Sequence, residues 1–452
     1  MVKGTRRTEN EPFFTLSPFT FHPLTLINMK KILSLCLMIV ICVQLQAQRF
    51  DDYFVNKTLR IDYLHTGDAN FDEYEIKSFH AGGIWSGTRA HLIDPYLYGN
   101  IIFQVYDSLT NTLIYSRTYS TLFEEYKATE KAEKEVASFE ECVNMPFPKR
   151  TVKVSFTSVS RRQEQTLKLE SYINPVTASI KNFEKEYEVM DLHIGGKPEQ
   201  SLDILFIPDG YAEKDQALLE RDMQRFASYI MECSPFKENK KKINIRAIKG
   251  YSQESGITDP NANAFKKTLL NTSYNVLDLD RYLMCLNVWK MYDIADDATY
   301  DAIVIICNSP KYGGGGIYNF YATVNNLHEK SSYVVVHELG HSIGGLGDEY
   351  YTSEVSVRDF YPEGIEPVEP NLTTLVNFEA KWKEMMDKDT PIPTPNTAQY
   401  KNTLGVFEGG GYVAKGVYRP VSSCTMKEAV YNHFCPVCTK TLINLINYYS
   451  NK

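Results

Sequence analysis

The 452-residue sequence predicts an α+β protein in which an antiparallel β-sandwich precedes a second domain of mixed α/β structure. Two patterns indicate this order. From Leu59 to about Ile173, short segments alternate apolar and polar residues between turn-rich stretches, which is typical of antiparallel strands. Beyond Pro175, apolar strand-like runs alternate with helix-like stretches, which favours a sheet covered by helices.

The strand-like segments fix the expected domain bounds. The first domain, expected at residues 50–178, contains "LRIDYL", "NIIFQVYD" and "RTVKVSFTSV". The second, expected at residues 185–452, opens on the buried strand "SLDILFIPDGY", which a helix-like stretch at residues 213–231 follows. Proline-rich stretches at residues 361–371 and 390–396 predict long surface loops of this domain.

The composition excludes some partners. With 43% hydrophobic and 23% charged residues, the chain can bury a sizeable core. Its formal net charge of -8 argues against nucleic acid or an anionic membrane as partner, because neither phosphates nor lipid headgroups would be attracted to it. The one basic run, at residues 237–242, is expected to be a solvated turn.

The N-terminal region has the features of a secretory signal. Two lysines precede an apolar run at residues 32–43, and Ala47 supplies a small residue for cleavage. The run is shorter than the roughly 20 residues of a membrane span. We therefore expect residues 29–47 to be a signal peptide and residues 1–28 an overextended start. The mature chain is expected to lack a transmembrane segment and to be periplasmic, cell-surface or secreted.

The segment "VVVHELGHSIGGLGDEYY", at residues 334–351, carries the predicted chemistry. His337 and His341 lie four residues apart, so on a helix both imidazoles can point at one ion. This spacing suits zinc, and Glu338 can take a proton from the attacking water and deliver it to the leaving amine. The alternative is a buried helix whose histidines only form hydrogen bonds. The apolar turn before the first histidine and Gly340 beside the second favour zinc.

The third ligand is less clear from the motif. Ser331 or Ser332 is expected to cap the helix, and the glycine pair that begins at Gly344 is expected to end it. Gly344 matches the turning glycine of H-E-x-x-H-x-x-G-x-x-H, but Gly347 replaces the last histidine.

A carboxylate is also an acceptable zinc ligand. We therefore expect one catalytic zinc ion, bound by the two histidines and Asp348, with Glu349 in reserve. The acid that does not bind is expected to orient a ligand or anchor a loop. If neither acid binds, His433 is the remaining candidate.

Two neighbouring segments fit such a site. The β-prone stretch 317–325, after four glycines, predicts either an exposed edge strand to which an extended peptide adds itself or a plain hairpin edge, and both remain open. Met426 is a candidate for an apolar floor beneath the ligands, although a methionine is more often an ordinary core residue.

Cysteines offer a second possibility for metal binding. Of nine cysteines, Cys36 and Cys42 lie in the predicted signal, so seven remain and at least one has no intramolecular partner. A structural zinc site can be drawn from four residues near the C-terminus: Cys424, His433, Cys435 and Cys438. Export favours a disulfide instead, and a lone C-x-x-C lacks the second pair of a zinc ribbon.

Several motifs together resemble the bacterial IgA-peptidase family of zinc metallopeptidases, a metzincin-like group. They are "FIPDGY" at 206–211, "SQESGITDP" at 252–260, "HELGHSIGGLGDEY" at 337–350, "YRP" at 418–420, and "CTM" with "FCPVC" near the C-terminus. The resemblance covers most of the second domain, and "FEECVNMPFPK" at 139–149 is similar to the N-terminal β-domain of some members.

The resemblance implies a metzincin-like mixed α/β zinc-peptidase domain, with His337 and His341 as ligands and Glu338 as the catalyst. It does not carry over immunoglobulin A as the substrate. The expected function is that of an exported zinc endopeptidase acting on protein or peptide substrates, with host extracellular proteins among the candidates.

A surface binding or adhesion protein with a structural or vestigial metal site is the alternative, and the 31 tyrosines would suit a contact surface. Against it, a structural zinc needs a fourth protein ligand, whereas the helix supplies Glu338.

Overall fold

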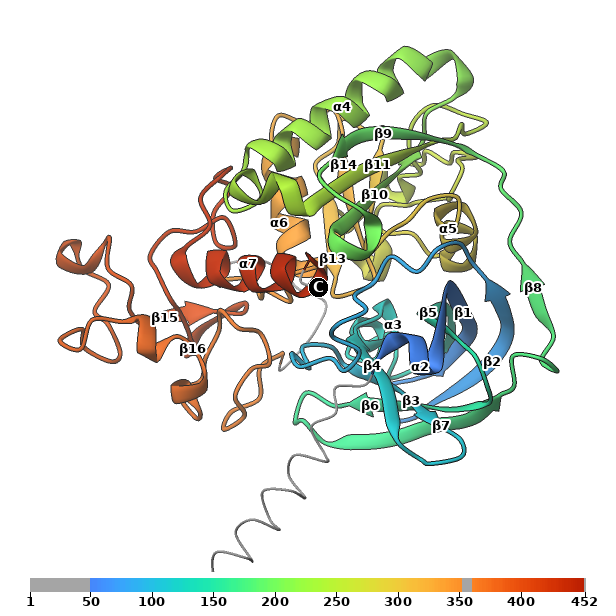
Figure 1. Ribbon diagram of the computed structural model, residues 1–452. Helices are drawn as coiled ribbons and strands as arrows, with labels where there is room; N and C mark the ends of the chain where they lie inside the picture. Colours follow the sequence, from blue (N-terminus) through green and yellow to red (C-terminus); the bar gives the residue numbers. More distant parts are fainter. Residues whose placement is uncertain (1–48, 352–359, 451–452) are drawn as a thin grey trace, which may run out of the picture. The chain divides into compact units, whose positions relative to one another are not determined.

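The computed structural model describes residues 49–351 and 360–450 (Figure 1). The predicted signal peptide and the predicted overextended start lie outside the described residues. Two short helices lie in the N-terminal part of the described chain: α2 (Phe50–Tyr53) precedes its first strand, and α3 (Leu122–Tyr126) lies between its fourth and fifth strands. Within the described ranges, no helix combines the length and the hydropathy that crossing a membrane requires.

Two four-stranded sheets make up the N-terminal part. The first has the order β5 (Ala137–Pro148), β1 (Phe54–Gly67), β2 (Asp72–Ala81), β8 (Ile180–Asn182). The second has the order β4 (Leu113–Tyr119), β3 (Ile101–Asp107), β6 (Val152–Val159), β7 (Gln165–Ile173). Neighbouring strands are antiparallel except β2 and β8, which are parallel.

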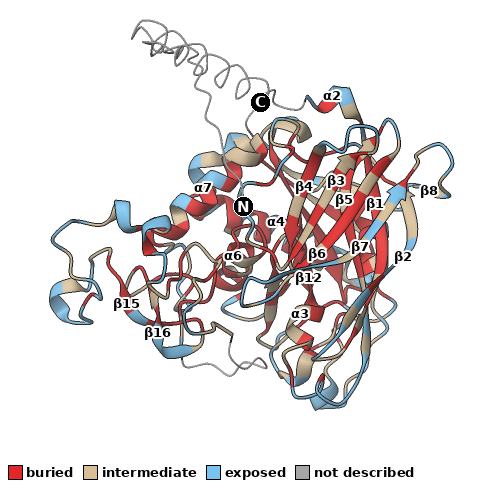
Figure 2. Cartoon of the chain, turned by 90° about the horizontal axis from the view of Figure 1, so that it is seen from below, coloured by how far each residue is buried: buried red, intermediate tan, exposed pale blue. Residues whose placement is uncertain are grey.

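Alternating side chains of both sheets enter one hydrophobic core, as the period of two predicts. In β3, Ile101, Phe103 and Val105 are buried and the residues between them are only partly covered. Tyr63 of β1 meets Phe156 of β6 across the two sheets, with ring centroids 5.1 Å apart. Figure 2 shows this buried interior along the strands.

A mixed six-stranded sheet forms the centre of the second part. Its order is β13 (Gly314–Ile317), β14 (Tyr321–Asn325), β12 (Ala302–Cys307), β10 (Leu202–Asp209), β11 (Ile243–Lys249), β9 (Glu188–Ile194). The four inner strands are parallel, and the edge strands β13 and β9 run antiparallel to their neighbours. The chain is therefore a mixed α/β structure with several sheets.

Both faces of this sheet are covered. Every residue of β10 is buried, with Ile204 and Phe206 in the core on one face and Leu205 and Ile207 in the core on the other. Such a strand is apolar throughout because it has no solvent side. The helices are α4 (Gln216–Glu232), α6 (Ser331–Ser342) and α7 (Pro436–Ser450), which contribute to the first core, and α5 (Val288–Ala295), which contributes to the second.

The N-terminal part packs on the second core. Leu122 and Cys142 belong to it, and the Trp289 indole donates to the Glu141 carbonyl oxygen over 2.9 Å. The fully buried Arg60 forms ion pairs with Asp296 at 3.0 Å and with Asp62 of its own strand, β1, at 2.8 Å. These contacts explain why the described residues from position 49 onward form one compact unit.

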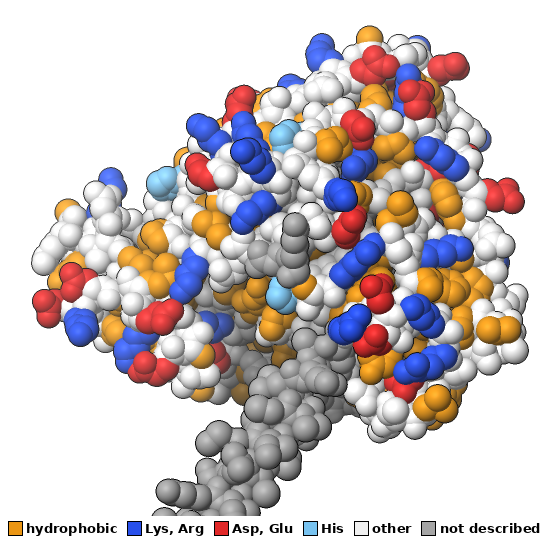
Figure 3. All heavy atoms as spheres, in the orientation of Figure 1, with side chains coloured by type: hydrophobic (Ala, Val, Ile, Leu, Met, Phe, Trp, Pro, Cys, Tyr) orange, Lys and Arg blue, Asp and Glu red, His pale blue; other side chains and the backbone are white. Residues whose placement is uncertain are grey.

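Irregular chain follows α6, as the proline-rich stretches predict. Short 3₁₀ helices and one hairpin interrupt it, and the hairpin consists of β15 (Phe407–Gly410) and β16 (Val413–Arg419). On the face in Figure 3, acidic and basic side chains are interspersed.

Candidate metal centre

Helix α6 presents the H-E-x-x-H motif from a buried position. It begins at Ser331, whose hydroxyl donates to the His328 carbonyl oxygen over 2.7 Å, and no side chain caps its N-terminus. The predicted serine cap is therefore wrong: the hydroxyl bonds backwards to the preceding turn. The predicted end is found, because the helix stops at Ser342 and Gly345 adopts a left-handed φ of 58° that reverses the chain.

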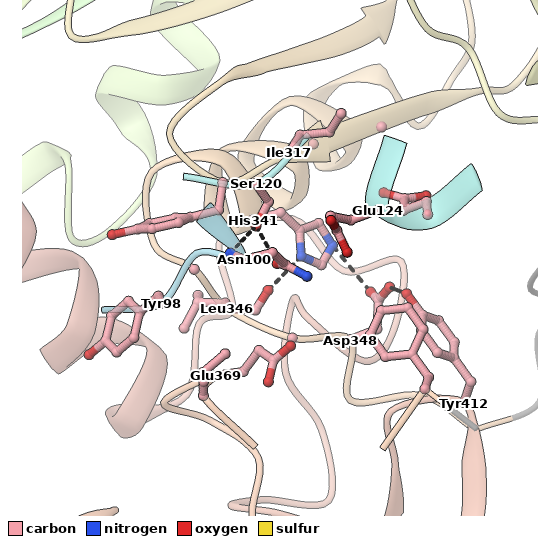
Figure 4. A pocket seen from close by; sticks show the side chains of 18 of the residues that line it. Tyr98, Asn100, Ser120, Glu124, Ile317, His341, Leu346, Asp348, Glu369 and Tyr412 are labelled. Atoms are coloured by element: carbon pink, nitrogen blue, oxygen red, sulfur yellow. Dashed lines mark hydrogen bonds and ion pairs between the residues drawn. The ribbon is translucent and has the colours of Figure 1, made fainter. Parts of the chain in front are cut away.

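Three potential ligand atoms meet beyond this turn. The Nε2 atoms of His337 and His341 are 3.2 Å apart, and Oδ1 of Asp348 lies 3.2 Å and 3.3 Å from them. Figure 4 shows His341 and Asp348 in this arrangement. Ligands about 2.0–2.1 Å from a tetrahedral zinc ion are about 3.3–3.4 Å from one another. Two imidazoles and a carboxylate are also a donor set that zinc accepts, so the residues fit such an ion.

The outer nitrogens of both histidines face backbone carbonyl groups. Nδ1 of His337 lies 3.0 Å from the Thr425 oxygen, and Nδ1 of His341 lies 2.6 Å from the Leu346 oxygen. A carbonyl oxygen can only accept, so each Nδ1 carries a proton, and in the neutral ring the lone pair is therefore on Nε2, which faces the shared point. The backbone therefore sets the tautomer that metal binding needs.

Asp348 is held by charge as well as by position. Although burial disfavours an ionised carboxyl, the charge of His341 holds the pKa of Asp348 well below its usual range. In return, and against the effect of burial, Asp348 raises the pKa of His341 to about 9. Oδ1 of Asp348 accepts no hydrogen bond, and a cation between the three groups would satisfy it.

The other two candidates for the third ligand point elsewhere. Oε1 of Glu349 accepts a hydrogen bond from the Asn371 amide over 3.0 Å and lies 3.3 Å from the Cys438 sulfur. His433 is exposed, and its backbone N–H donates to the Thr425 hydroxyl. The structure thus brings Asp348, and neither Glu349 nor His433, to the two histidines.

Glu338 lies beside the two histidines. Its carboxylate is within 4.8 Å of the ring nitrogens of both histidines, and burial, which outweighs the attraction of the histidines, raises its pKa. A Cβ added to Gly314 would stand 3.1 Å from its Oε1.

The glycine run brings a strand against the helix. β13 consists of Gly314–Ile317 and forms the sheet edge, while β14 lies inside, so the edge is the glycine run and not the predicted stretch 317–325. A Cβ on Gly316 would be 2.5 Å from the Glu338 carbonyl oxygen, which explains the glycine. Strands β13 and β14 form a hairpin, which is one of the two predicted alternatives. On the outer side of β13, Tyr282 forms an isolated β-bridge with Gly314.

Met426 packs against helix α6 at Gly340. It is fully buried, and its sulfur would be 2.7 Å from a Cβ added to Gly340. Because Gly340 has no side chain, the methionine can approach the helix between the two histidines.

A cavity of about 540 Å³ opens over these groups (Figure 4). His337, Glu338, His341 and Asp348 form part of its lining. The loop at 360–369 contributes a wall, and the N-terminal part contributes others through Tyr98, Asn100, Ser120, Glu124, Glu125 and Arg161. Both halves of the chain thus build the site.

Family comparison decides the class of the protein. Residues 190–403 and 396–446 match the family model described as IgA Peptidase M64, and residues 49–170 match the Peptidase M64 N-terminus. This chain belongs to the M64 peptidase family. It is therefore a peptidase, a hydrolase of peptide bonds, and the resemblance found in the sequence is confirmed. No curated protein matches the chain.

Some residues of this M64 site have no clear sequence signal. Tyr412 donates to Asp348, but "EGGGY" predicts only a turn. Thr425 acts through its carbonyl group, which every residue has. The cavity walls from the N-terminal part depend on packing between segments more than 150 residues apart.

Proposed function

We propose that this M64 peptidase is an exported, zinc-dependent endopeptidase that cleaves protein substrates. The observation that carries the proposal is the triangle of His337, His341 and Asp348, whose edges of 3.2–3.3 Å fit a tetrahedral zinc ion that keeps its fourth position open. A site closed by a fourth protein ligand would suit the adhesion alternative better. Glu338 stands beside the triangle instead.

The positions of these residues assign each of them a role in the proposed reaction. When bound, zinc supplies a Lewis acid that polarises a carbonyl group and lowers the pKa of water. Glu338 takes the proton of the attacking water and passes it to the leaving amine. Its raised pKa suits both steps, because a carboxylate that is too acidic holds a proton poorly. Asp348 and the two histidines hold the ion.

An extended peptide is the substrate form that the cavity favours. Gly314 and Gly316 of the edge strand β13 line the cavity and are only partly covered, so their backbone groups are close to a passing chain. Pairing of a peptide with this strand would provide main-chain hydrogen bonds without demanding particular side chains. The Tyr282 bridge covers one side of Gly314, which limits the pairing to part of the strand.

A metzincin-like architecture is part of the proposal. Three features support it: the left-handed turn at Gly345 after the second histidine, the delivery of Asp348 from just beyond that turn, and the packing of Met426 against helix α6 at Gly340. Asp348 takes the place of the third histidine of the H-E-x-x-H-x-x-G-x-x-H motif.

Export rests on the predicted signal peptide at residues 29–47. Host extracellular proteins are candidate substrates on this basis, and immunoglobulin A has no special standing among them. N-terminal sequencing of the exported protein tests this part. We expect a mature chain that begins near Gln48, and a retained leader would contradict export by cleavage.

Metal removal tests the enzymatic proposal. The purified mature chain should cleave denatured protein substrates, lose this activity to a chelator and regain it with zinc. Full activity in metal-free protein would exclude a zinc enzyme. Absence of cleavage across a broad peptide library, with a partner bound equally well by wild type and Glu338→Gln, would favour the adhesion alternative.

A further inference from the structure

A second cluster of metal-ligand side chains lies apart from the histidines. The sulfurs of Cys424, Cys435 and Cys438 and a carboxylate oxygen of Glu349 are all within 4.8 Å of one another. All four residues are buried, and Glu349 is 0% exposed. Three cysteines and one acid converge here from a loop, a turn and the start of α7.

Distances inside the cluster suit a tetrahedral ion. The sulfurs of Cys424 and Cys438 are 3.8 Å apart, and the Cys438 sulfur is 3.3 Å from Oε1 of Glu349. Sulfurs about 2.3 Å from a tetrahedral zinc ion are about 3.8 Å from each other, and a sulfur and an oxygen are about 3.5 Å apart. A disulfide needs an S–S distance of about 2.0 Å.

Backbone N–H groups surround the sulfurs. Met426 and Cys435 direct their N–H groups at the Cys424 sulfur over 3.5 Å and 3.3 Å, and Cys438 directs its N–H at the Cys435 sulfur over 3.5 Å. Cys435 also immediately precedes the 15-residue helix α7, whose N-terminus favours negative charge. These N–H groups can donate to thiolates, the form of cysteine that binds metals, while burial raises the pKa of Cys424 to about 12 and that of Cys438 well above its usual range, so that an ion in the cluster is needed to hold all three as thiolates.

Glu349 gives an independent indication. Its Oε2 is buried and has no hydrogen-bond partner, although its Oε1 has one. A buried carboxylate oxygen without a partner is costly, and a cation in the cluster would supply one.

A disulfide satisfies this cluster less well. All seven cysteines of the described chain are free thiols. Joining any two of the three clustered cysteines would leave the third thiol and Oε2 of Glu349 without a partner beside an apolar core. The predicted alternative with His433 fails on geometry, since that residue is exposed and Glu349 takes the fourth place.

We infer that Glu349, Cys424, Cys435 and Cys438 bind a second divalent metal ion of the zinc type in a closed, structural four-ligand site. Thiol ligands select such soft-to-borderline ions over calcium or magnesium. Binding displaces the three thiol protons to solvent and leaves three thiolates and one carboxylate around the ion. No coordination position remains for water, so this site binds without catalysing.

The second site would fix two segments that contact the histidine site. Glu349 directly follows Asp348, and its backbone N–H donates to the Met426 carbonyl oxygen over 2.8 Å. Thr425, whose carbonyl group orients His337, directly follows Cys424. One ion would therefore fix both the segment that delivers the third ligand and the turn that orients His337.

Metal counting with matched variants tests the inference. Full-length protein should be exported by the expression host, purified without chelator and assayed for zinc per chain. We expect two ions in the wild type, one in a His337→Ala, His341→Ala double variant, and one in a Cys435→Ser, Cys438→Ser double variant. Cys233→Ser changes a buried thiol outside the cluster and should retain two.

Cobalt provides a readout that needs no cysteine variant. In the double histidine variant, bound Co²⁺ should show thiolate-to-cobalt charge-transfer absorption in the near ultraviolet. Denatured, demetallated wild type should titrate as seven thiols. A single ion that the double histidine variant loses, or five thiols with a mass two hydrogens lower, would overturn the inference in favour of a disulfide.

The two proposals fail in different ways. A wild type with one ion that survives the double histidine substitution would exclude the zinc peptidase and support the cysteine site. A wild type with one ion that is lost in the double histidine variant would support the zinc peptidase and exclude the cysteine site.

Discussion

Tyr412 donates its hydroxyl hydrogen to Oδ2 of Asp348 across 2.5 Å, while Oδ1 of the same carboxylate faces the two histidines. Tyr412 adopts a left-handed φ of 68°, which is uncommon for a residue with a bulky side chain. The N–H of Gly411 also donates to the Asp348 carbonyl oxygen over 2.8 Å. The β15–β16 hairpin thereby fixes both the backbone and the side chain of the proposed ligand.

Tyr412→Phe tests this support. Loss of the hydroxyl removes the hydrogen bond that orients the carboxylate, so zinc affinity at the histidine site should fall about 10- to 100-fold. Titration against a competing chelator measures the change. Tyr418→Phe, in the same hairpin, should leave the affinity unchanged. Equal affinity in both variants would show that the carboxylate needs no support from Tyr412.

Asp348 and Glu349 should have separable effects on metal content. Asp348→Ala removes one of three protein ligands, so the histidine site should lose its ion, and Asp348→His should recover part of the affinity. Glu349→Ala should spare the histidine site and weaken the cysteine site. Cobalt spectra distinguish the two, because only the cysteine site gives thiolate charge transfer. If Glu349→Ala empties the histidine site and Asp348→Ala does not, the ligand is wrongly assigned.

Gly316→Ala tests the close approach of β13 to α6. The added Cβ would meet the Glu338 carbonyl oxygen at 2.5 Å, so strand or helix must shift, at a cost of about 1–3 kcal/mol in the free energy of unfolding. Gly83→Ala is the control, since its nearest contact would be 3.6 Å. Denaturant unfolding of both variants should show a loss only for Gly316→Ala. If Gly316→Ala were as stable as the wild type, β13 would not be in close contact with α6 at this position.

His65 should make stability depend on pH. It is fully buried, and acidic groups face it from three elements: Glu141 on β5, Asp72 on β2 and Glu124 beside them on α3. Burial opposes its charge, but Glu141 and then Asp72 raise its pKa above the ordinary 6.5. Lys127 and Lys168 also form ion pairs with Asp72, so they compete with His65 for this carboxylate.

The direction of the effect follows from the raised pKa. The folded state binds the proton more tightly than the unfolded chain, so the stabilisation is complete below about pH 6.5 and is lost as the pH rises through the folded-state pKa. The difference in unfolding free energy between wild type and His65→Gln should thus be largest in mild acid and shrink in alkali. His193→Gln, outside this cluster, is the control. A difference that grows with pH would contradict a charged His65.

Local features of the fold could be predicted from the sequence. The period of two predicts antiparallel strands because a strand places alternate residues on opposite faces, and β3 shows this alternation. The spacing of His337 and His341 predicts a shared ion because a helix returns to the same face after four residues. Both patterns depend only on backbone geometry.

Contacts between distant segments could not be predicted in this way. The sequence indicates a strand at 317–325 from β-propensity, yet the edge consists of glycines, because only residues without a side chain fit against the Glu338 backbone. His433 is closer in sequence to the cysteines than Glu349, yet Glu349 reaches them because the chain turns back after α6. Such choices depend on packing, which a single sequence does not display.

Glu338→Gln is the most direct test of the proposed mechanism. Glutamine has nearly the same shape but cannot accept a proton as a general base, and the three proposed ligands are untouched. We expect zinc content equal to the wild type and turnover of a peptide substrate lower by about 10²- to 10⁴-fold, with both measured on the same preparation. Unchanged turnover with the zinc retained would contradict the assignment of Glu338, and with it the metal-assisted mechanism proposed for this peptidase.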